Sequence, residues 1–311
     1  MTEYQAVDIS VYQGATDYPL LASKTELVTL RASIGQQEDL LFSTHWDGLE
    51  QQAHRIGAYH YFIPYINGVY QAEAMLEILG DRVPVIWDSV NDAFVPGVTA
   101  DCEYNTGLSP SALSARIKAF GEHITAERPG WIVQVYTRGS WWNTNIGLSQ
   151  RLYFAACPLW IARYTNTNPE PWGNPGDPSW LRPFPWLIED EWQRSADGNN
   201  KGAEYGVSSD DIDLDVLRNY STQPPPPDPI PPDPPSEYPQ TGKVNAGGGL
   251  NLRSYPALDS KYKIRTMPNN TALTIYDELP LQNGYEWTIV RDALGYVGVC
   301  ASKYVTVDSN I

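Results

Sequence analysis

Residues 97–137 read GVTADCEYNTGLSPSALSARIKAFGEHITAERPGWIVQVYT, and this stretch decides the fold of the N-terminal part of the chain. Its middle, residues 109–127, has the apolar spacing of an amphipathic helix, with Ser109 as a suitable N-cap. The apolar run at 131–137 predicts a strand, and a second strand ends near Asp101. Strand, helix and strand in this order are typical of a parallel sheet covered by helices.

The same alternation extends in both directions from this stretch. Further strands are expected at 27–33, 56–63, 83–87, 158–164 and 211–217, and a helix at 71–79. Alternating β and α units over about 220 residues predict an α/β fold, an irregular TIM-like β/α barrel.

A different composition begins near residue 222. Ten of the 26 prolines lie between Pro224 and Pro239, and such a segment is expected to be an extended spacer. A proline-rich ligand for an SH3 or WW partner is the alternative. Residues 240–311 contain short apolar runs separated by Gly, Pro and Asn, which predicts a small all-β barrel. The expected organisation is therefore a domain at 1–221, a linker at 222–239 and a domain at 240–311.

Charge and composition exclude several classes of function. The 311 residues contain 21 Lys and Arg against 37 Asp and Glu, a net charge of −16, so a nucleic-acid partner is not expected. Most of this acidity belongs to residues 1–221, with 28 acidic against 14 basic residues. No apolar run reaches 18 residues, and the N-terminus lacks a signal-peptide pattern, so neither membrane insertion nor a leader is expected. Three scattered cysteines suit neither a disulfide framework nor a zinc site, so neither a metal nor a cofactor is expected. The protein is also expected to be a monomer.

Paired carboxyls indicate where chemistry takes place. Asp101 and Glu103 are two residues apart at a predicted strand end, so both would point into the barrel mouth. Two close carboxylates resist ionising together, which provides the protonated acid and the anion that a glycosidase needs. Taken alone, such a pair is more often a solvated loop. Asp8 and Asp213 lie in other apolar runs, and together the four would form an acidic cleft.

The order of several motifs resembles glycoside hydrolase family 25, the Chalaropsis-type lysozymes. The matching segments are AVDISVYQG (6–14), TLRASIGQQEDLLF (29–42), IGAYHYF (56–62), VTADCEYNTGLS (98–109), VQVYT with the following WW (133–142), PLWIARYT (158–165) and EWQRS with DIDLDVL (191–217). They cover essentially the whole first domain.

The resemblance implies roles for individual residues. Glu103 would be the general acid, and Asp101 would stabilise the positively charged intermediate or orient the acetamido group of the substrate. Asp8 and Asp213 would be supporting carboxyls. Aromatic and amide side chains would line and close the cleft, namely Tyr59, Tyr136, Tyr164, Trp192 and Gln193. Core packing is the alternative for the aromatic residues.

Two departures from the family pattern leave alternatives open. Residues 85–100 separate the Val83–Pro84 pair from the Asp101 motif, where the family has almost none. Either a loop is inserted before the strand, or Asp88, with Asp92 nearby, takes the role given to Asp101. Cys102 replaces an aliphatic residue and is expected in the core, while a catalytic thiol assisted by His60 is the remote alternative.

The C-terminal domain resembles bacterial SH3-like domains. VNAGGGLNLRSYP (244–256) is similar to their opening, and GYVGVCASKYV (295–305) to their ending. The resemblance implies binding to the bacterial cell wall. Trp287, Tyr285 and Tyr296 are the candidate contacts, with core packing as the alternative.

Together the two resemblances imply a modular peptidoglycan hydrolase that acts on the bacterial cell wall. It would cleave the β-1,4 bond between N-acetylmuramic acid and N-acetylglucosamine, and a phage endolysin is preferred to a bacterial autolysin. A barrel that binds glycan without cleaving it, and a hydrolase of another aminosugar polymer, are the alternatives.

Overall fold

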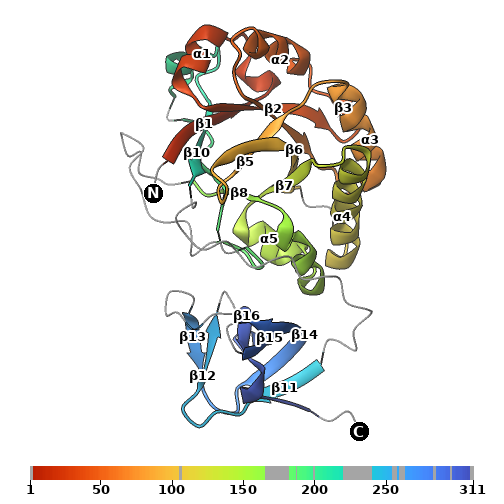
Figure 1. Cartoon of the computed structure of the whole chain (residues 1–311), viewed down its shortest axis with the longest axis vertical. Coiled ribbons are helices and arrows are strands. Elements are labelled where there is room, and N and C mark those ends of the chain that lie inside the picture. Colours follow the sequence, from red (N-terminus) through yellow and green to blue (C-terminus); the bar gives the residue numbers. More distant parts are fainter. Residues whose placement is uncertain are drawn as a thin grey trace. The chain divides into compact units, whose positions relative to one another are not determined.

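The computed structural model describes residues 3–104, 107–164, 182–186, 188–198, 200–219, 240–253, 258, 263–282, 285–294 and 296–308. The chain forms two compact units (Figure 1). The predicted linker at 222–239 lies outside the described residues, so the predicted domain limits stay predictions.

The first unit is a mixed α/β fold built on a closed barrel. Its eight barrel strands, as far as the chain is described, are β1 (Glu3–Ile9), β2 (Leu27–Ile34), β4 (Ile56–Tyr61), β6 (Ala93–Asp101), β7 (Ile132–Thr137), β8 (Leu159–Ala162), β9 (Glu191–Ser195) and β10 (Asp213–Arg218). The ring runs β1-β10-β9-β8-β7-β6-β4-β2 and closes where β2 pairs with β1. All neighbouring pairs are parallel except those of β10, which is antiparallel to both β1 and β9. The short strand β3 (Gln37–Glu38) extends β2 outside the ring.

Helices cover the outside of this barrel (Figure 1). They are α1 (Tyr18–Lys24), α2 (Phe42–Glu50), α3 (Gly68–Leu79), α4 (Pro110–Glu127) and α5 (Gly139–Asn145), with 3-10 turns at η1 (Val11–Gln13) and η4 (Gly202–Tyr205). A further 3-10 turn, η2 (Leu148–Ala156), follows α5 in the chain. The predicted cap of α4 is confirmed, because the Ser109 hydroxyl accepts a hydrogen bond from the Ala112 backbone N–H at 3.3 Å. The apolar face of α4 is buried through Leu113, Ile117 and Phe120, at the spacing of a helix that covers a sheet. In the described part of the chain, none of the helices has the length and apolar character needed to span a membrane.

The insertion before the Asp101 motif is a β-hairpin. The strand predicted at 83–87 exists as β5 (Val85–Asp88), but it pairs antiparallel with the first half of β6 and stays outside the ring. Trp87 anchors the hairpin: its ring packs against Tyr4 and Phe94, and its indole N–H donates to the carbonyl of Arg218. The hairpin therefore packs against the start of β1, at Tyr4, and against the end of β10, at Arg218.

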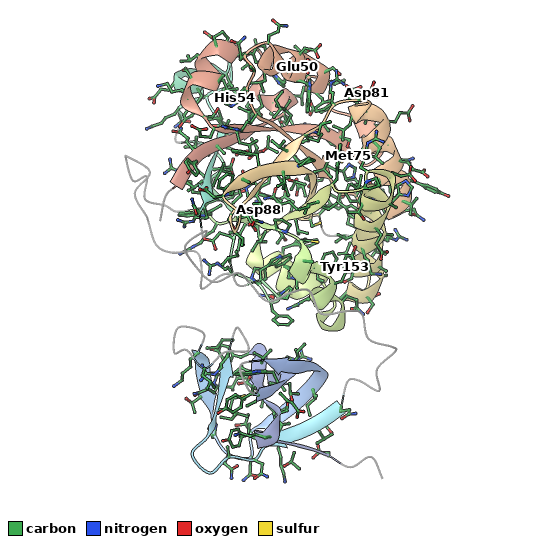
Figure 2. All side chains as sticks on the ribbon, in the orientation of Figure 1. Glu50, His54, Met75, Asp81, Asp88 and Tyr153 are labelled. Carbon is green, nitrogen blue, oxygen red and sulfur yellow. The ribbon has the colours of Figure 1, made fainter. Side chains whose placement is uncertain are left out.

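The hairpin also decides between Asp101 and Asp88. Asp88 lies at the end of β5 (Figure 2). Its carboxylate accepts from the backbone N–H groups of Val90 and Asn91. Its strand partner is Ala93, the first residue of β6, and Asp101 is the last, about 25 Å further along the strand. Asp88 is thus a turn residue at the far end of β6.

The second unit is all-β. Its strands are β11 (Gln240–Val244), β12 (Leu250–Arg253), β13 (Lys263–Met267), β14 (Ala272–Gln282), β15 (Tyr285–Asp292), β16 (Val297–Ala301) and β17 (Val305–Val307), with the 3-10 turn η6 (Ser302–Tyr304) before the last. They form one sheet in the order β13-β12-β16-β15-β14-β11-β17, with antiparallel pairs. The all-β unit predicted from the short apolar runs of this part of the chain is confirmed.

One predicted ligand contact of the second unit, Trp287, is a core residue instead. Trp287 is only 1% exposed, so it belongs to the interior and cannot bind a ligand at the surface. Tyr285 is half-buried against it, with ring centroids 6.1 Å apart. Tyr296 remains exposed, with the Arg265 guanidinium 5.2 Å from its ring centroid.

Candidate active site

Strand register brings the predicted carboxyls to one end of the barrel. Asp8, near the end of β1, lies directly opposite Asp213, the first residue of the antiparallel β10. Asp101 is the last residue of β6, and Glu103 follows it in the chain. Because the parallel strands end at the edge where β10 begins, all four residues belong to the same mouth. The structure thus brings together the four carboxyl residues that the sequence selected.

One amide connects the two sides of the mouth. Gln193, on β9, donates from Nε2 to Asp8 Oδ2 at 2.7 Å. Its Oε1 accepts from the hydroxyls of Tyr136 at 2.7 Å and Tyr164 at 3.0 Å. Gln193 itself is 4% exposed, so these bonds hold its orientation in a dry environment.

Arg138 extends this chain of contacts to Glu103. Its Nη2 donates to the Tyr164 hydroxyl at 3.2 Å, and its guanidinium lies over the Tyr164 ring at 5.1 Å from the centroid. The same Nη2 lies 3.6 Å from Glu103 Oε2. Polar contacts therefore run without a break from Asp8 on β1 to Glu103 beyond β6.

Burial and mutual repulsion raise the pKa values of these carboxyls. Burial raises the pKa of Asp213, and the neighbouring Asp8 raises it further. The pKa of Asp8 is raised by burial as well, although its hydrogen bonds with Gln193 and Asp213 oppose the shift. Because the two carboxyls are hydrogen-bonded to each other, the pair retains a proton at a pH where free aspartates are ionised.

Asp101 and Glu103 differ in their exposure. Asp101 is 6% exposed, and its Oδ1 has no hydrogen-bond partner within the described part of the chain. Its pKa is raised well above the ordinary value by burial and then by the charge of Glu103. The Glu103 side chain remains 25% exposed, and burial raises its pKa while Arg138 opposes the shift. Glu103 is therefore a reachable acid, and Asp101 a buried acceptor beside it.

Two further acids lie deeper in the barrel and were missed from the sequence. Asp215 follows Asp213 by two residues on β10, so both point to the same side. Glu191 precedes Gln193 by two residues on β9, so these two side chains also point to the same side. Both are fully buried, and burial raises their pKa values well above the ordinary ones. The alternation in DIDLDVL contained the signal for Asp215.

The aromatic predictions have different outcomes. Tyr59, Tyr136 and Trp160 pack together inside the barrel, with edge-to-face rings of Tyr136 and Trp160 at 4.8 Å. Tyr164 is 40% exposed beside Arg138, so it lines the opening. Trp192 is not in the cleft: it is 1% exposed and alternates with Gln193, so it points away from the mouth, and its indole N–H donates to the carbonyl of Arg163. The prediction that Trp192 closes the cleft is corrected accordingly.

The thiol alternative finds no support in the geometry. Cys102 is 1% exposed, and burial raises its pKa well above the ordinary value, which keeps the thiol neutral. His60 is fully buried, and its ring nitrogens already contact Ser33 Oγ at 2.7 Å and Gln71 Oε1 at 3.0 Å. Asp92 lies at the exposed turn of the hairpin with a φ of 53°, away from the mouth.

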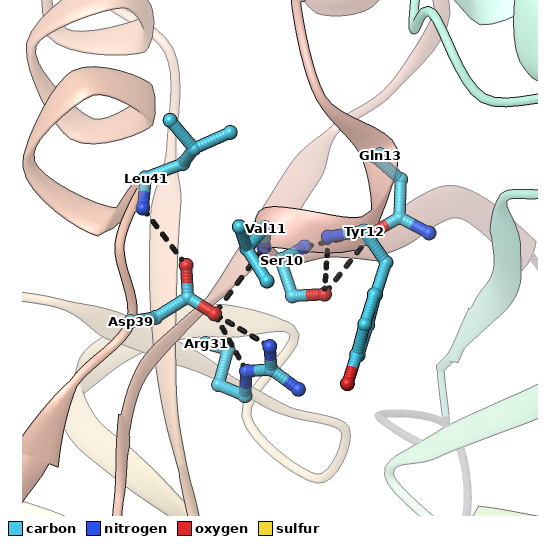
Figure 3. Close-up of polar contacts among 7 residues, drawn as sticks. All are labelled: Ser10, Val11, Tyr12, Gln13, Arg31, Asp39 and Leu41. Carbon is cyan, nitrogen blue, oxygen red and sulfur yellow. Dashed lines mark hydrogen bonds and ion pairs between the residues drawn. The ribbon is translucent and has the colours of Figure 1, made fainter.

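A buried ion pair supports the loop that follows Asp8. Asp39 Oδ2 accepts from Arg31 Nε at 2.7 Å and from the Val11 backbone N–H at 3.2 Å (Figure 3). The Arg31 guanidinium lies 4.9 Å from the centroid of the exposed Tyr12 ring. The charge of Arg31 also partly offsets the raised pKa of Asp101. Within the described residues, no group of three or more potential metal ligands is found.

We predict that Asp215→Asn stabilises the protein near pH 7 by about 1–3 kcal/mol. The pKa of this carboxyl is higher in the folded than in the unfolded state. The folded state therefore loses stability as the pH rises from the pKa of the unfolded state to that of the folded state. The Asn side chain stays neutral and can still accept the Trp160 indole N–H, which donates to Asp215 Oδ1 at 3.0 Å. Thermal unfolding at pH 7 and pH 4 measures the effect, which should shrink at pH 4.

The exposed Asp211→Asn, two residues before Asp213, is the matched control and should change stability at neither pH. A variant at Asp215 that is less stable than wild type at pH 7 would show that its carboxylate is ionised and paired.

Known proteins share this architecture. The family described as "Glycosyl hydrolases family 25" matches residues 7–202. Lysozyme M1 of Streptomyces globisporus is 28% identical over 212 residues, which cover 65% of this chain and 65% of that protein. The bacterial lysozyme of Streptomyces coelicolor superposes with a TM-score of 0.54 at 25% identity, covering 72% of this chain and 95% of that one. A muramidase from Trichobolus zukalii gives a TM-score of 0.51 at 26% identity, covering 71% and 96%.

The family match runs from β1 to beyond β9 of the barrel unit. The chain spans slightly less than two thirds of the length of the curated lysozyme it matches. The family match covers residues 7–202, more than half of the chain, and includes Asp8, Asp101 and Glu103. The chain belongs to glycosyl hydrolases family 25.

Proposed function

We propose that the chain is a peptidoglycan hydrolase, an N-acetylmuramidase that cleaves the β-1,4 bond between N-acetylmuramic acid and N-acetylglucosamine. The relatives named lysozyme and muramidase support this substrate class. The observation that carries the proposal is the pairing of a reachable acid, Glu103, with the buried Asp101 at the barrel mouth. An endolysin role remains a prediction from the sequence.

Glu103 is the proton donor in this proposal. Its raised pKa keeps the carboxyl protonated at a higher pH than a free glutamate, and its partial exposure lets a glycosidic oxygen approach it. Arg138 lies 3.6 Å from Glu103 Oε2 and stabilises the carboxylate that remains after the proton has left.

Asp101 and the Asp8–Asp213 pair support the developing positive charge. Asp101 is assigned the role of orienting the acetamido group of an N-acetylated sugar, since its Oδ1 has no hydrogen-bond partner within the described residues. The hydrogen bond from Gln193 fixes Asp8, so its carboxylate need not reorganise when charge develops. The partly exposed Glu103 beside the buried Asp101 supports a catalytic role over glycan binding alone.

We predict that Glu103→Gln abolishes cleavage while glycan binding persists, because the amide keeps the shape of the side chain but cannot donate the proton. The loss in kcat should be at least about 100-fold. Mass spectrometry of purified peptidoglycan, digested with wild type or variant, checks this.

Three product patterns decide between the candidate functions. Reducing-end muramic acid from wild type alone supports a muramidase with Glu103 as its acid. Reducing-end glucosamine would instead identify a glucosaminidase. No soluble product from either protein would favour glycan binding without cleavage.

The second unit is proposed as a wall-binding module of the bacterial SH3-like type. Residues 240–311 carry 7 basic and 6 acidic residues, whereas residues 1–221 are strongly acidic. The bacterial wall is anionic, so charge opposes the approach of the barrel unit and makes a separate binding unit useful. Tyr285 and Tyr296 remain candidate surface contacts.

Deleting residues 222–311 should therefore lower activity on whole cell walls more than about tenfold, while activity on small soluble fragments changes little. Turbidity loss of walls and release of reducing sugar from fragments are compared at equal enzyme concentration. Circular dichroism first checks that the truncated chain is folded. Equal losses on both substrates would contradict a wall-binding role.

A further inference from the structure

Three tyrosines form an aromatic surface next to Glu103. Tyr61 is the last residue of β4, Tyr104 follows Glu103 directly, and Tyr65 lies in the turn before α3. The Tyr104 ring contacts both others edge-to-face, with centroids 6.4 Å from Tyr61 and 6.4 Å from Tyr65. We call these three residues the tyrosine surface.

This surface is open to solvent. Tyr65 is 63% exposed and Tyr104 is 40% exposed, while Tyr61 is half-buried. Much of their ring area therefore stays in contact with water in the folded protein. Burying that apolar area against a ligand would be favourable. Contiguous exposed aromatic rings of this kind mark binding surfaces more often than isolated ones do.

Hydrogen bonds from side chains of α3 and α4 hold the turn that carries Tyr65. Gln71 Oε1 accepts from the Ile63 backbone N–H at 2.8 Å, and Gln71 Nε2 donates to the Ile63 carbonyl at 3.1 Å. From α4, Arg116 Nη1 donates to the Pro64 carbonyl at 2.6 Å. Because this turn is already ordered in the folded protein, a ligand that contacts Tyr65 would bind with a smaller loss of conformational entropy.

The tyrosine surface continues directly from the candidate active site. Tyr61 pairs in strand register with Asp101. The pKa of Tyr61 is raised to about 12, first by burial and then by Glu103 and Asp101, which agrees with this proximity. A glycan strand whose scissile oxygen lies at Glu103 therefore has these rings as its next neighbours on this side of the mouth.

We propose that Tyr61, Tyr104 and Tyr65 form an additional sugar-binding subsite, which holds pyranose rings of the glycan strand beyond the cleaved bond. The inference rests on the proposed function. The apolar C–H faces of pyranose rings match the faces of tyrosines, and continuity with the acidic mouth favours the glycan over the stem peptides as occupant. The subsite makes long strands bind better than short ones.

The test uses the full chain carrying Glu103→Gln, so that ligands are not cleaved. Calorimetry measures its affinity for peptide-free peptidoglycan glycans of two, four and six sugars. The affinity should rise with length. Adding Tyr65→Ala with Tyr104→Ala should lower the affinity for the six-sugar glycan about tenfold and flatten the dependence on length.

Tyr65→Phe with Tyr104→Phe is the matched control, since it keeps the rings, and it should preserve the dependence on length. Unchanged affinity after both alanine substitutions would overturn the subsite, even if product analysis upholds the muramidase. A loss confined to glycans that carry stem peptides would overturn the sugar as occupant. If no glycan binds and wild type releases no product, the subsite fails together with the proposed function.

Discussion

The antiparallel pairing of β10 with β1 is the constraint on which the candidate site depends. It closes the barrel and places Asp213 directly opposite Asp8. With β10 parallel, its first residues would lie at the other end of the barrel, because parallel strands begin where their neighbours begin. The reversal thus adds a carboxyl from the last strand to the mouth where the parallel strands end.

Burying several carboxyls in one barrel is costly, and the structure offsets this cost by hydrogen bonds and by neutral protonation states. Gln193, Tyr136 and Tyr164 form a polar bridge across the mouth. Below it, Trp160 donates to Asp215, and Gln134 lies 3.4 Å from Glu191. Carboxyls that stay protonated avoid most of the penalty for burying charge. A site of this kind can hold an acid ready to donate at a pH where a free carboxyl has lost its proton.

Much of this arrangement could be predicted from local pattern. Asp8, Asp101 and Asp213 were recognisable because each interrupts an apolar run, and Ser109 because it precedes a helical pattern. The pairing of Asp8 with Asp213 was not predictable, since about 200 residues separate them and register depends on the whole ring. Trp192 was misassigned although strand alternation forbids adjacent residues from facing the same side. The hairpin at β5 looked like a barrel strand, because strand patterns do not show which partner a strand takes.

The most direct test of the account is a carbon-13 NMR titration of the aspartate and glutamate carboxyls, with wild type beside Glu103→Gln. The account predicts that Asp8, Asp101 and Asp213 titrate above the ordinary value of 3.8. It also predicts that the pKa of Asp101 falls in the variant, because the charge of Glu103 is removed. Site carboxyls that titrate at ordinary values, or an Asp101 that titrates identically in both proteins, would contradict the coupled acid pair.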